Sequence, residues 1–453
     1  MNHQPSPITR RQFIRQAACA AVGTSAIAST IFDLRLVNAI MANGTPTDYK
    51  ALVCVFLYGG NDANNLIVPR TGTDYDNYAA ARQNLALAQG SLLTINPLTS
   101  DGHDYGFHPS CPELQSLFNT GKLALLANVG TLVYPMSKAQ YQSGSVPKPP
   151  QLFSHNDQQV QWQTSIPDQP AKTGWGGRCA DLLYTLNAGA QVSMSISLSG
   201  FNTWEVGNLI QQYQVSTTGS VGLSNLSSNQ LNAVKGILAL PHTNVFEEAY
   251  ADTTDRAIAN HELLSGALTG IAEPPGFPTT SLGNQLKMIG KLIAARDALL
   301  MKRQIFFCSI GGYDTHGEQL ISQAGLLAEL SQSLNAFYNY INVTLGIPDK
   351  VTAFTASDFG RTYPSNGIGS DHGWGAHQLI VGDAVQGQKL YGTFPTPVVN
   401  GPDDTGLGRW IPTTAVDQYS ATLAKWFGVS QTDLATVFPN LSRFNSPDLG
   451  FML

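Results

Sequence analysis

The sequence predicts an α/β protein, a three-layer sandwich with a mostly parallel central sheet and loop-rich insertions. Three apolar runs, residues 51–58, 304–310 and 351–355, each lead through a turn of small residues into an acid. Uninterrupted apolar runs of this length are typical of strands that are buried on both faces, as in a parallel sheet covered by helices. The 43 glycines and 25 prolines indicate long ordered loops around this core.

The remaining elements are expected in alternation along the chain. Residues 112–118 predict a helix with Pro112 in its first turn, and residues 122–129 predict the next buried strand. Apolar and small polar residues alternate over 191–198, which predicts a half-buried strand. Apolar residues at helical spacing predict helices at 286–300, 326–341 and 414–427.

The mixed, polar segment 200–283 contains only short helical patterns. We expect it to form an insertion or a cap over the functional site. The domain itself is expected to cover residues 43–453, because a chain of this length can bury a large core.

The charge of the chain argues against nucleic acid as a partner. Only 12% of the residues are charged, the formal net charge is −6, and no block of basic residues is present. Nucleic-acid binding rests on clustered positive charge, which this sequence lacks.

The N-terminal segment has the pattern of a twin-arginine export signal. Arg10 and Arg11 precede a weakly apolar stretch, residues 17–31, that is too short and too polar for a stable membrane span. We therefore expect residues 1–42 to be a signal peptide and leader, and the protein to be periplasmic or secreted. The alternative is an ordinary amphipathic helix.

Three acids follow the predicted strands. The carboxyl ends of parallel strands share one edge of a sheet, where ligands bind, so Asp62, Asp314 and Asp358 are expected to meet there. The alternatives are turn formation by Asp62 and an ion pair between Asp358 and Arg361.

Histidines accompany these acids in two segments, Asp314-Thr-His316 and the glycine-rich residues 370–377. Imidazole and carboxylate ligands suit zinc, manganese or iron better than calcium. The second segment could instead be a loop packed by Trp374. The complete set of predicted metal ligands is Asp62, Asp314, His316, Asp358, Asp371, His372 and His377.

Catalytic candidates lie in the segment 153–162. Ser154 stands at the start of a predicted helix, where it could either cap the helix together with Asp157 or act as a nucleophile. His155 could orient a substrate oxygen, and Arg361 could bind an anionic one.

Taken together, these motifs resemble the family called domain of unknown function 1501, which looks like a branch of the alkaline phosphatase and sulfatase superfamily. The resemblance spans nearly the whole mature chain. It rests on the export signal and on residues 56–62, 107–109, 153–155, 314–316, 357–361, 371–373, 417–419 and 426–428.

The resemblance implies an alkaline-phosphatase-like core with two metals beside a serine, threonine or formylglycine nucleophile. Asp62 would match the aspartate of the first strand, and Asp314 with His316 would match a later aspartate–histidine pair. This chain departs from the pattern at Phe359, which follows Asp358 where a histidine is expected, and it has no Cys-x-Pro-x-Arg sulfatase signature.

These observations predict an exported, metal-dependent hydrolase of phosphate or sulfate esters, acting on a small molecule or a polysaccharide. Either Ser154 or a water molecule would attack the ester. The alternative is a non-catalytic envelope protein for binding or assembly, with a degenerate site that holds no metal.

Overall fold

The computed structural model describes residues 48–223 and 225–453, and the contacts group Asp48–Leu453 into one compact unit. The predicted export signal, residues 1–42, lies outside the described residues.

Three parallel strands form the centre of the sheet. β1 (Lys50–Leu57) lies between β9 (Arg303–Ile310) and β10 (Val351–Ser357). All residues of β9 and β10 are buried, as are all residues of β1 except Lys50. Both faces of these strands are covered, which explains their uninterrupted apolar sequence.

The sheet continues on both sides of this centre. Beyond β10 come antiparallel β11 (Ala376–Val381), β5 (Leu123–Gly130), and the short β12 (Leu390–Tyr391) and β13 (Thr414–Ala415), which both pair with β5. Beyond β9 come β6 (Ser195–Ser197), β7 (Tyr213–Ser216) and β8 (Gly219–Ser220). The predicted α/β class with a mostly parallel sheet is therefore confirmed. A separate small sheet joins β2 (Ile67–Pro69), β4 (Tyr105–Phe107) and β3 (Leu93–Thr94).

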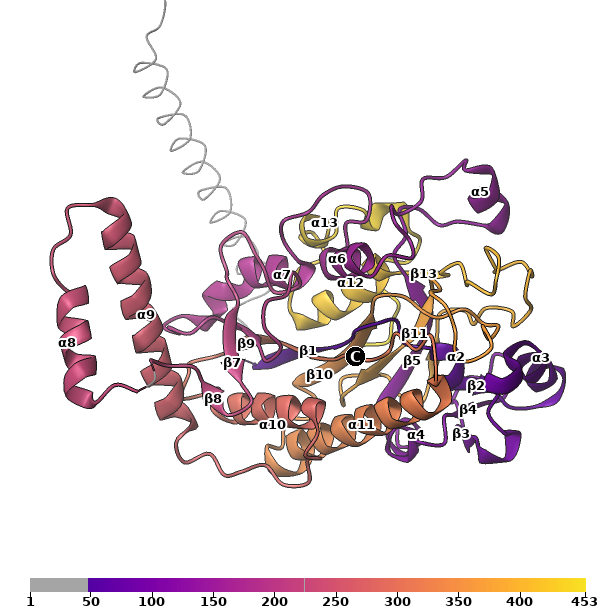
Figure 1. The fold of residues 1–453 in the computed structure, drawn as a ribbon, viewed down its shortest axis with the longest axis horizontal. Helices are drawn as coiled ribbons and strands as arrows, with labels where there is room; N and C mark the ends of the chain where they lie inside the picture. Colours follow the sequence, from indigo (N-terminus) through magenta and orange to yellow (C-terminus); the bar gives the residue numbers. More distant parts are fainter. Residues whose placement is uncertain (1–47, 224) are drawn as a thin grey trace, which may run out of the picture. The chain divides into compact units, whose positions relative to one another are not determined.

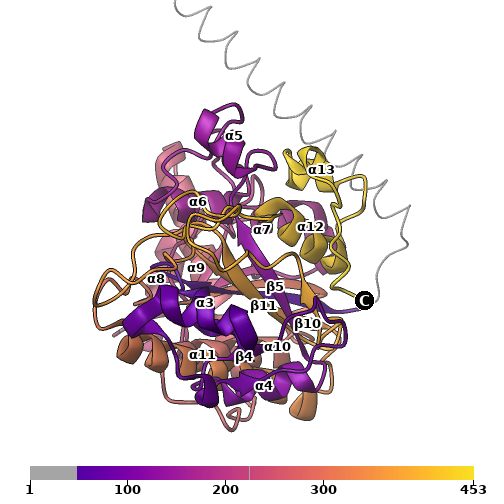
Figure 2. The same cartoon turned by 90° about the vertical axis from the view of Figure 1, so that its right-hand side faces the viewer.

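Helices cover the two faces of the sheet as separate layers (Figures 1 and 2). One layer contains α4 (Pro112–Asn119), α10 (Ser281–Ala294) and α11 (Gln319–Asn339). The other contains α6 (His155–Thr164), α7 (Trp175–Leu183), α12 (Val416–Phe427) and α13 (Leu434–Val437). The helices α2 (Ala63–Leu66), α3 (Gly72–Arg82) and α5 (Lys138–Ser143) lie in the connections.

Helix ends differ from the expected ones by a few residues. α10 begins at Ser281, where Thr280 caps it, and ends at Ala294 rather than at residue 300. Gly428 ends α12 as expected, in a conformation with φ of 126°. β6 pairs with β9 and β7, is shorter than expected, and is fully buried instead of half-buried.

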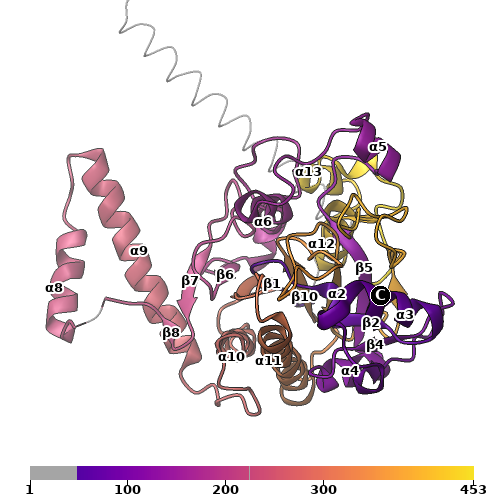
Figure 3. The same ribbon diagram turned by 45° about the vertical axis from the view of Figure 1, so that its right-hand side comes forward.

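Helices α8 (Ser228–Leu238) and α9 (Val245–Leu268) form an arm beside β8 (Figure 3). No residue of α8 is buried, and α9 buries only Ala251, Ile258 and Leu264. Within the described residues, no helix is long and apolar enough to cross a membrane.

Candidate metal centre

The three central strands end at the same level. Leu57 of β1 pairs with Ile310 of β9 and with Ser357 of β10, so the turns that follow these strands start side by side. Gly59 permits a close approach of two of these turns. Its φ is 113°, and a Cβ there would lie 2.4 Å from the backbone nitrogen of Asp314. The strand ends therefore bring distant segments of the chain into contact.

Asp314 lies at the centre of a group of three imidazoles. Its Oδ1 is 3.1 Å from Nε2 of His316 and 3.1 Å from Nε2 of His372. Its Oδ2 is 3.5 Å from Nε2 of His155. The side chains of Asp314 and His316 are 44% and 47% exposed, so the cluster is open to solvent on this side.

Each of the three imidazoles is held at its Nδ1 by a group that only accepts hydrogen bonds. The partner of His155 is the Asp358 carboxylate at 2.7 Å, and that of His316 is the Asp371 carboxylate at 3.1 Å. The third ring, His372, is held by the carbonyl oxygen of Phe153 at 2.8 Å. The Nδ1 atom must therefore carry the proton in each ring, which leaves the Nε2 lone pair free in the neutral form.

The free nitrogens converge closely enough to share an ion. Nε2 of His316 lies 3.0 Å from Nε2 of His372, and both lie near the same Asp314 oxygen. In a tetrahedral zinc site with bonds of about 2.0–2.1 Å, neighbouring ligand atoms are about 3.3 Å apart. Ligand atoms of His155, Asp314 and His372 also lie within 4.8 Å of one another. Lone pairs that face one another repel, so this arrangement calls for a cation or a shared proton, and imidazole with carboxylate suits zinc, iron or manganese.

Local charges support this role. Burial alone would raise the pKa of Asp314, but the hydrogen bond and charge of Arg361, together with His316 and His155, hold it below its ordinary value. The hydrogen bond from Asn366 is the main reason why the pKa of Asp371 is lowered. Both acids are therefore carboxylates at neutral pH.

The histidines differ in their protonation. The hydrogen bond to Asp358 raises the pKa of His155, whereas burial lowers the pKa of His372. Neutral imidazole is the form that binds metals, so His372 is well prepared as a ligand.

Arg361 lies behind Asp314 and away from solvent. Its Nη1 donates to Asp314 Oδ1 at 2.7 Å and to the Gly59 carbonyl at 3.2 Å, and its Nη2 donates to the Ser370 carbonyl. The guanidinium is completely buried. Arg361 therefore positions Asp314, instead of presenting its donors to a substrate as the sequence suggested.

Ser154 is the N-cap residue of α6, directly before His155. Its hydroxyl donates to the Asp157 carboxylate at 2.6 Å and does not accept from the backbone of the first turn. Ser154 thus stands at the helix start without the expected capping hydrogen bond to the backbone, and the Asp157 carboxylate is placed to accept its proton.

Two of the predicted ligands lie elsewhere. The Asp62 carboxylate is buried and engaged by the Arg82 guanidinium and by the side-chain amide of Gln319. His377 is buried in β11, where its Nδ1 accepts the backbone N–H of Asn128 at 3.1 Å. Burial lowers the pKa of His377 to about 3. Neither residue contributes an atom to the cluster, because each already has partners inside the protein.

Asp358 was predicted as a metal ligand, but it contacts the cluster only through its hydrogen bond to His155. Its Oδ2 accepts from His155, from the Gln159 side chain at 2.9 Å and from the Gly59 backbone at 3.2 Å. Its Oδ1 is buried without a hydrogen-bond partner among the described residues. Asp358 therefore orients His155 instead of offering an oxygen to the cluster.

Sequence reasoning missed three contributors, Phe153, Gln159 and Arg409. Phe153 acts through its carbonyl, which no side-chain pattern reveals. Gln159 follows His155 by one helical turn, a spacing that places both on the same face of α6 and could have indicated it. Arg409 comes from a loop far along the chain, and its Nε donates to the His372 carbonyl at 2.9 Å.

The fold and the site together define an α/β protein with an open cluster of three histidines and an aspartate, a candidate metal centre, at the carboxyl edge of its sheet. The chain belongs to the family described as protein of unknown function DUF1501, whose model matches residues 49–405. No curated protein sequence matches it.

Solved structures show distant likeness. Ps i-CgsB, also solved in complex with k-i-k-neocarrahexaose, has 10% identity and a TM-score of 0.35, with 88% of this chain and 78% of that chain covered. The PsFucS1 sulfatase from Pseudoalteromonas sp. has 10% identity and a TM-score of 0.33, covering 94% and 74%. The C-terminal periplasmic domain of EcEptC from Escherichia coli, in complex with Zn, has 13% identity and a TM-score of 0.24, covering 75% and 74%.

Proposed function

We propose that this protein is an exported, metal-dependent hydrolase of phosphate or sulfate esters, carried by small molecules or by a polysaccharide. The observation that carries the proposal is the convergence of the free Nε2 atoms of His316 and His372 on Asp314 Oδ1. When bound there, a divalent ion would polarise the ester oxygen and stabilise negative charge on the leaving group.

The side chains around the cluster divide the remaining tasks. Asp314, His316 and His372 would hold the ion, while Arg361 and Asp371 fix the positions of Asp314 and His316. Second partners of this kind orient ligands and strengthen binding.

Ser154 and His155 are placed for proton transfer. Asp157 accepts the hydrogen bond of the Ser154 hydroxyl and can take its proton if that oxygen attacks the ester. The raised pKa of His155 favours a proton on its Nε2, from which the leaving oxygen could be protonated. If His155 is instead a fourth ligand, a His155→Gln variant will lose metal as well as activity.

A second candidate function is binding or assembly without catalysis. It is favoured by the burial of Arg361 and by the ion pair of Asp62 with Arg82, because these contacts remove two groups expected in the site. The two candidate functions predict different results for ester turnover. A hydrolase that carries its metal turns over an ester, whereas a binding protein does not.

The test is elemental analysis of protein purified without chelator, followed by assays on phosphate, sulfate and carboxylate esters. The hydrolase predicts bound zinc, manganese or iron, turnover that a chelator abolishes, and recovery when the same metal is restored. Protein without metal, or stoichiometric metal without turnover of any ester, would favour the binding protein.

A further inference from the structure

Arg409 is held beside the cluster at two points. Its Nε donates to the His372 carbonyl at 2.9 Å, and its guanidinium carbon lies 4.3 Å from the centre of the Phe153 ring. Phe153 in turn accepts the Nδ1 hydrogen bond of His372. Both anchors of Arg409 therefore belong to residues that shape the metal centre.

The loop that carries Arg409 is itself fixed. The buried Asp404 carboxylate accepts the backbone N–H groups of Gly406, Gly408 and Arg409 at 2.7–2.9 Å. Gly408 has a φ of 66°, and a Cβ there would lie 2.5 Å from the side chain of Tyr363. The loop thus delivers Arg409 in a defined position.

The outer edge of the Arg409 guanidinium has no partner. Within residues 48–223 and 225–453, neither Nη1 nor Nη2 makes a hydrogen bond or an ion pair. Arg361 and Arg82, in contrast, are buried against Asp314 and Asp62. A guanidinium whose Nε and one face are anchored presents its two terminal NH₂ groups as a fork for two oxygens.

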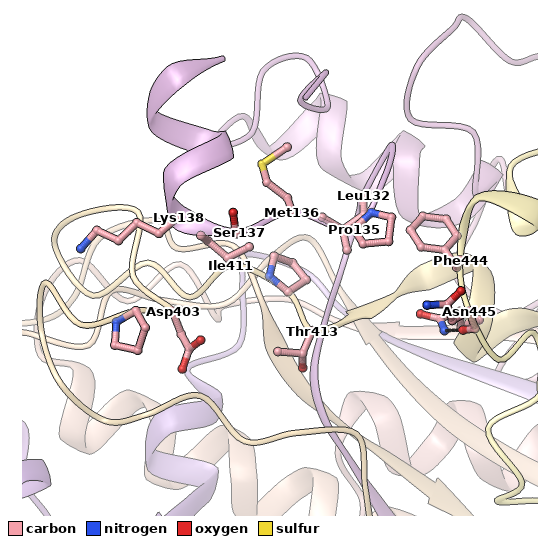
Figure 4. A pocket seen from close by; sticks show the side chains of 13 residues that line it. Leu132, Pro135, Met136, Ser137, Lys138, Asp403, Ile411, Thr413, Phe444 and Asn445 are labelled. Carbon is pink, nitrogen blue, oxygen red and sulfur yellow. Dashed lines mark hydrogen bonds between the residues drawn. The ribbon is translucent and has the colours of Figure 1, made fainter. Parts of the chain in front are cut away.

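A neighbouring cavity lacks such a free cation. It has a volume of about 520 Å³ and lies between the loop of residues 132–138, residues 402–413 and Phe444 (Figure 4). Its one ammonium group, that of Lys138, donates to the carbonyls of Asn400 and Gly401 at 2.7 and 3.0 Å. An anionic group is therefore better matched by Arg409 than by this cavity.

We propose that Arg409 binds two oxygens of a tetrahedral phosphate or sulfate group at the metal centre and thereby selects anionic esters. The proposal rests on the hydrolase function proposed above and names the residue that recognises the charge of the substrate. Arg409 takes the role that the sequence suggested for the buried Arg361.

The test uses the full chain with Arg409→Met, which removes the charge, and Arg409→Lys, which keeps the charge without the fork. Arg443→Met is the matched control, because Arg443 also lies over an aromatic ring, at 4.7 Å from the centre of Tyr134, but pairs with Asp168 away from the cluster. Binding of inorganic phosphate and of inorganic sulfate is measured by calorimetry, with and without metal. Turnover is measured with 4-nitrophenyl phosphate, 4-nitrophenyl sulfate and the uncharged 4-nitrophenyl acetate.

We expect Arg409→Met to weaken binding of the preferred anion by about 10- to 100-fold, the range for a lost charge-assisted hydrogen bond. Arg409→Lys should lose less, and Arg443→Met should bind like the parent protein. All variants should keep their metal. In Arg409→Met, turnover of the preferred anionic ester should fall at least about tenfold further than turnover of the acetate, which reports on the metal centre without the charge of the substrate. The anion with the larger loss identifies the substrate as a phosphate or a sulfate ester.

Unchanged anion affinity in Arg409→Met overturns the inference, and so does a parent protein that binds neither anion. These outcomes do not depend on turnover. If no ester is hydrolysed by any form of the protein, the hydrolase function fails, while the anion affinities still decide the role of Arg409.

Discussion

Three histidines that look alike in the sequence have different environments in the structure. His316 and His372 direct free Nε2 atoms at Asp314, whereas His377 accepts a backbone hydrogen bond inside the sheet. Their substitution by glutamine should therefore have different effects.

We predict that His316→Gln and His372→Gln lose metal and keep the fold, because the sheet core does not depend on these loops. The loss in metal affinity should exceed the roughly 10- to 100-fold that is typical of removing an outer partner of a ligand. His377→Gln should keep its metal and lose about 1–3 kcal/mol of stability, because the Asn128 N–H loses its acceptor. Metal stoichiometry and melting temperature measured on the same samples check this, and full metal retention in all three variants would leave only a structural role for them.

Glu205 offers a prediction about pH. Burial raises the pKa of Glu205 from an ordinary value of 4.5 to about 8, although Asn202 donates a hydrogen bond to it. Its second oxygen is buried without a partner among the described residues. Between pH 4.5 and 8 the folded protein therefore retains a proton that the unfolded chain releases, so the free energy of unfolding should fall as the pH rises through this window.

Glu205→Gln should remove this dependence, because glutamine stays neutral. In the parent protein, the free energy of unfolding should fall by about 1.4 kcal/mol per pH unit within this window. Denaturant unfolding at pH 5 and pH 8 measures it. A parent protein and a variant with parallel pH profiles would show that Glu205 is ionised in the folded state.

The accuracy of sequence reasoning about single residues depended on how local their partners are. Asp314 and His316 could be found because they share one turn after a strand. Asp62 and His377 carry the same chemistry, but their partners Arg82 and Asn128 are fixed by folding, at separations of 20 and 249 residues. Arg409 was missed for the same reason, since Phe153 and His372 come to it only in the folded protein.

At the scale of elements, the strands were the most predictable part. A strand covered on both faces is apolar along its length, so β1, β9 and β10 could be predicted from the sequence. The arm of α8 and α9 could not be predicted in this way, because its helices bury few side chains and so lack a clear apolar face.

We predict that the arm is dispensable for the core. Replacing residues 228–254 by a short glycine–serine linker removes α8 and the first part of α9, and keeps the buried Ile258 and Leu264. Such a linker can close the gap, because Gly222 lies against His261 at the base of the arm. Metal content and melting temperature should stay close to those of the full chain.

The same truncation tests the expectation that residues 200–283 cap the site. No residue of this segment contributes to the cluster of His155, Asp314, His316 and His372. Ester turnover should therefore survive the truncation. A truncated protein that keeps its metal and loses turnover would instead give the arm a role in enclosing the substrate.

At the scale of the whole molecule, we propose that folding and export are linked through metal binding. The cluster joins segments that follow β9 and β10 and the start of α6, so it forms only after the sheet has assembled. If the protein is exported, it would benefit from folding around its ion before it leaves the cytoplasm. The twin-arginine pattern of Arg10 and Arg11 fits this need, because that route carries folded proteins.

We predict that replacing Arg10 and Arg11 together with lysine abolishes accumulation of the protein outside the cytoplasm. Lysine keeps the positive charge of the segment, so a signal that required charge alone would still work. Fractionation of cells that produce the parent and the variant, with immunoblotting of each fraction, measures the effect. The variant should accumulate inside with its metal bound, since the cluster lies entirely within Asp48–Leu453. Equal export of both proteins would exclude the twin-arginine route and with it the reason for expecting the metal to be acquired before export.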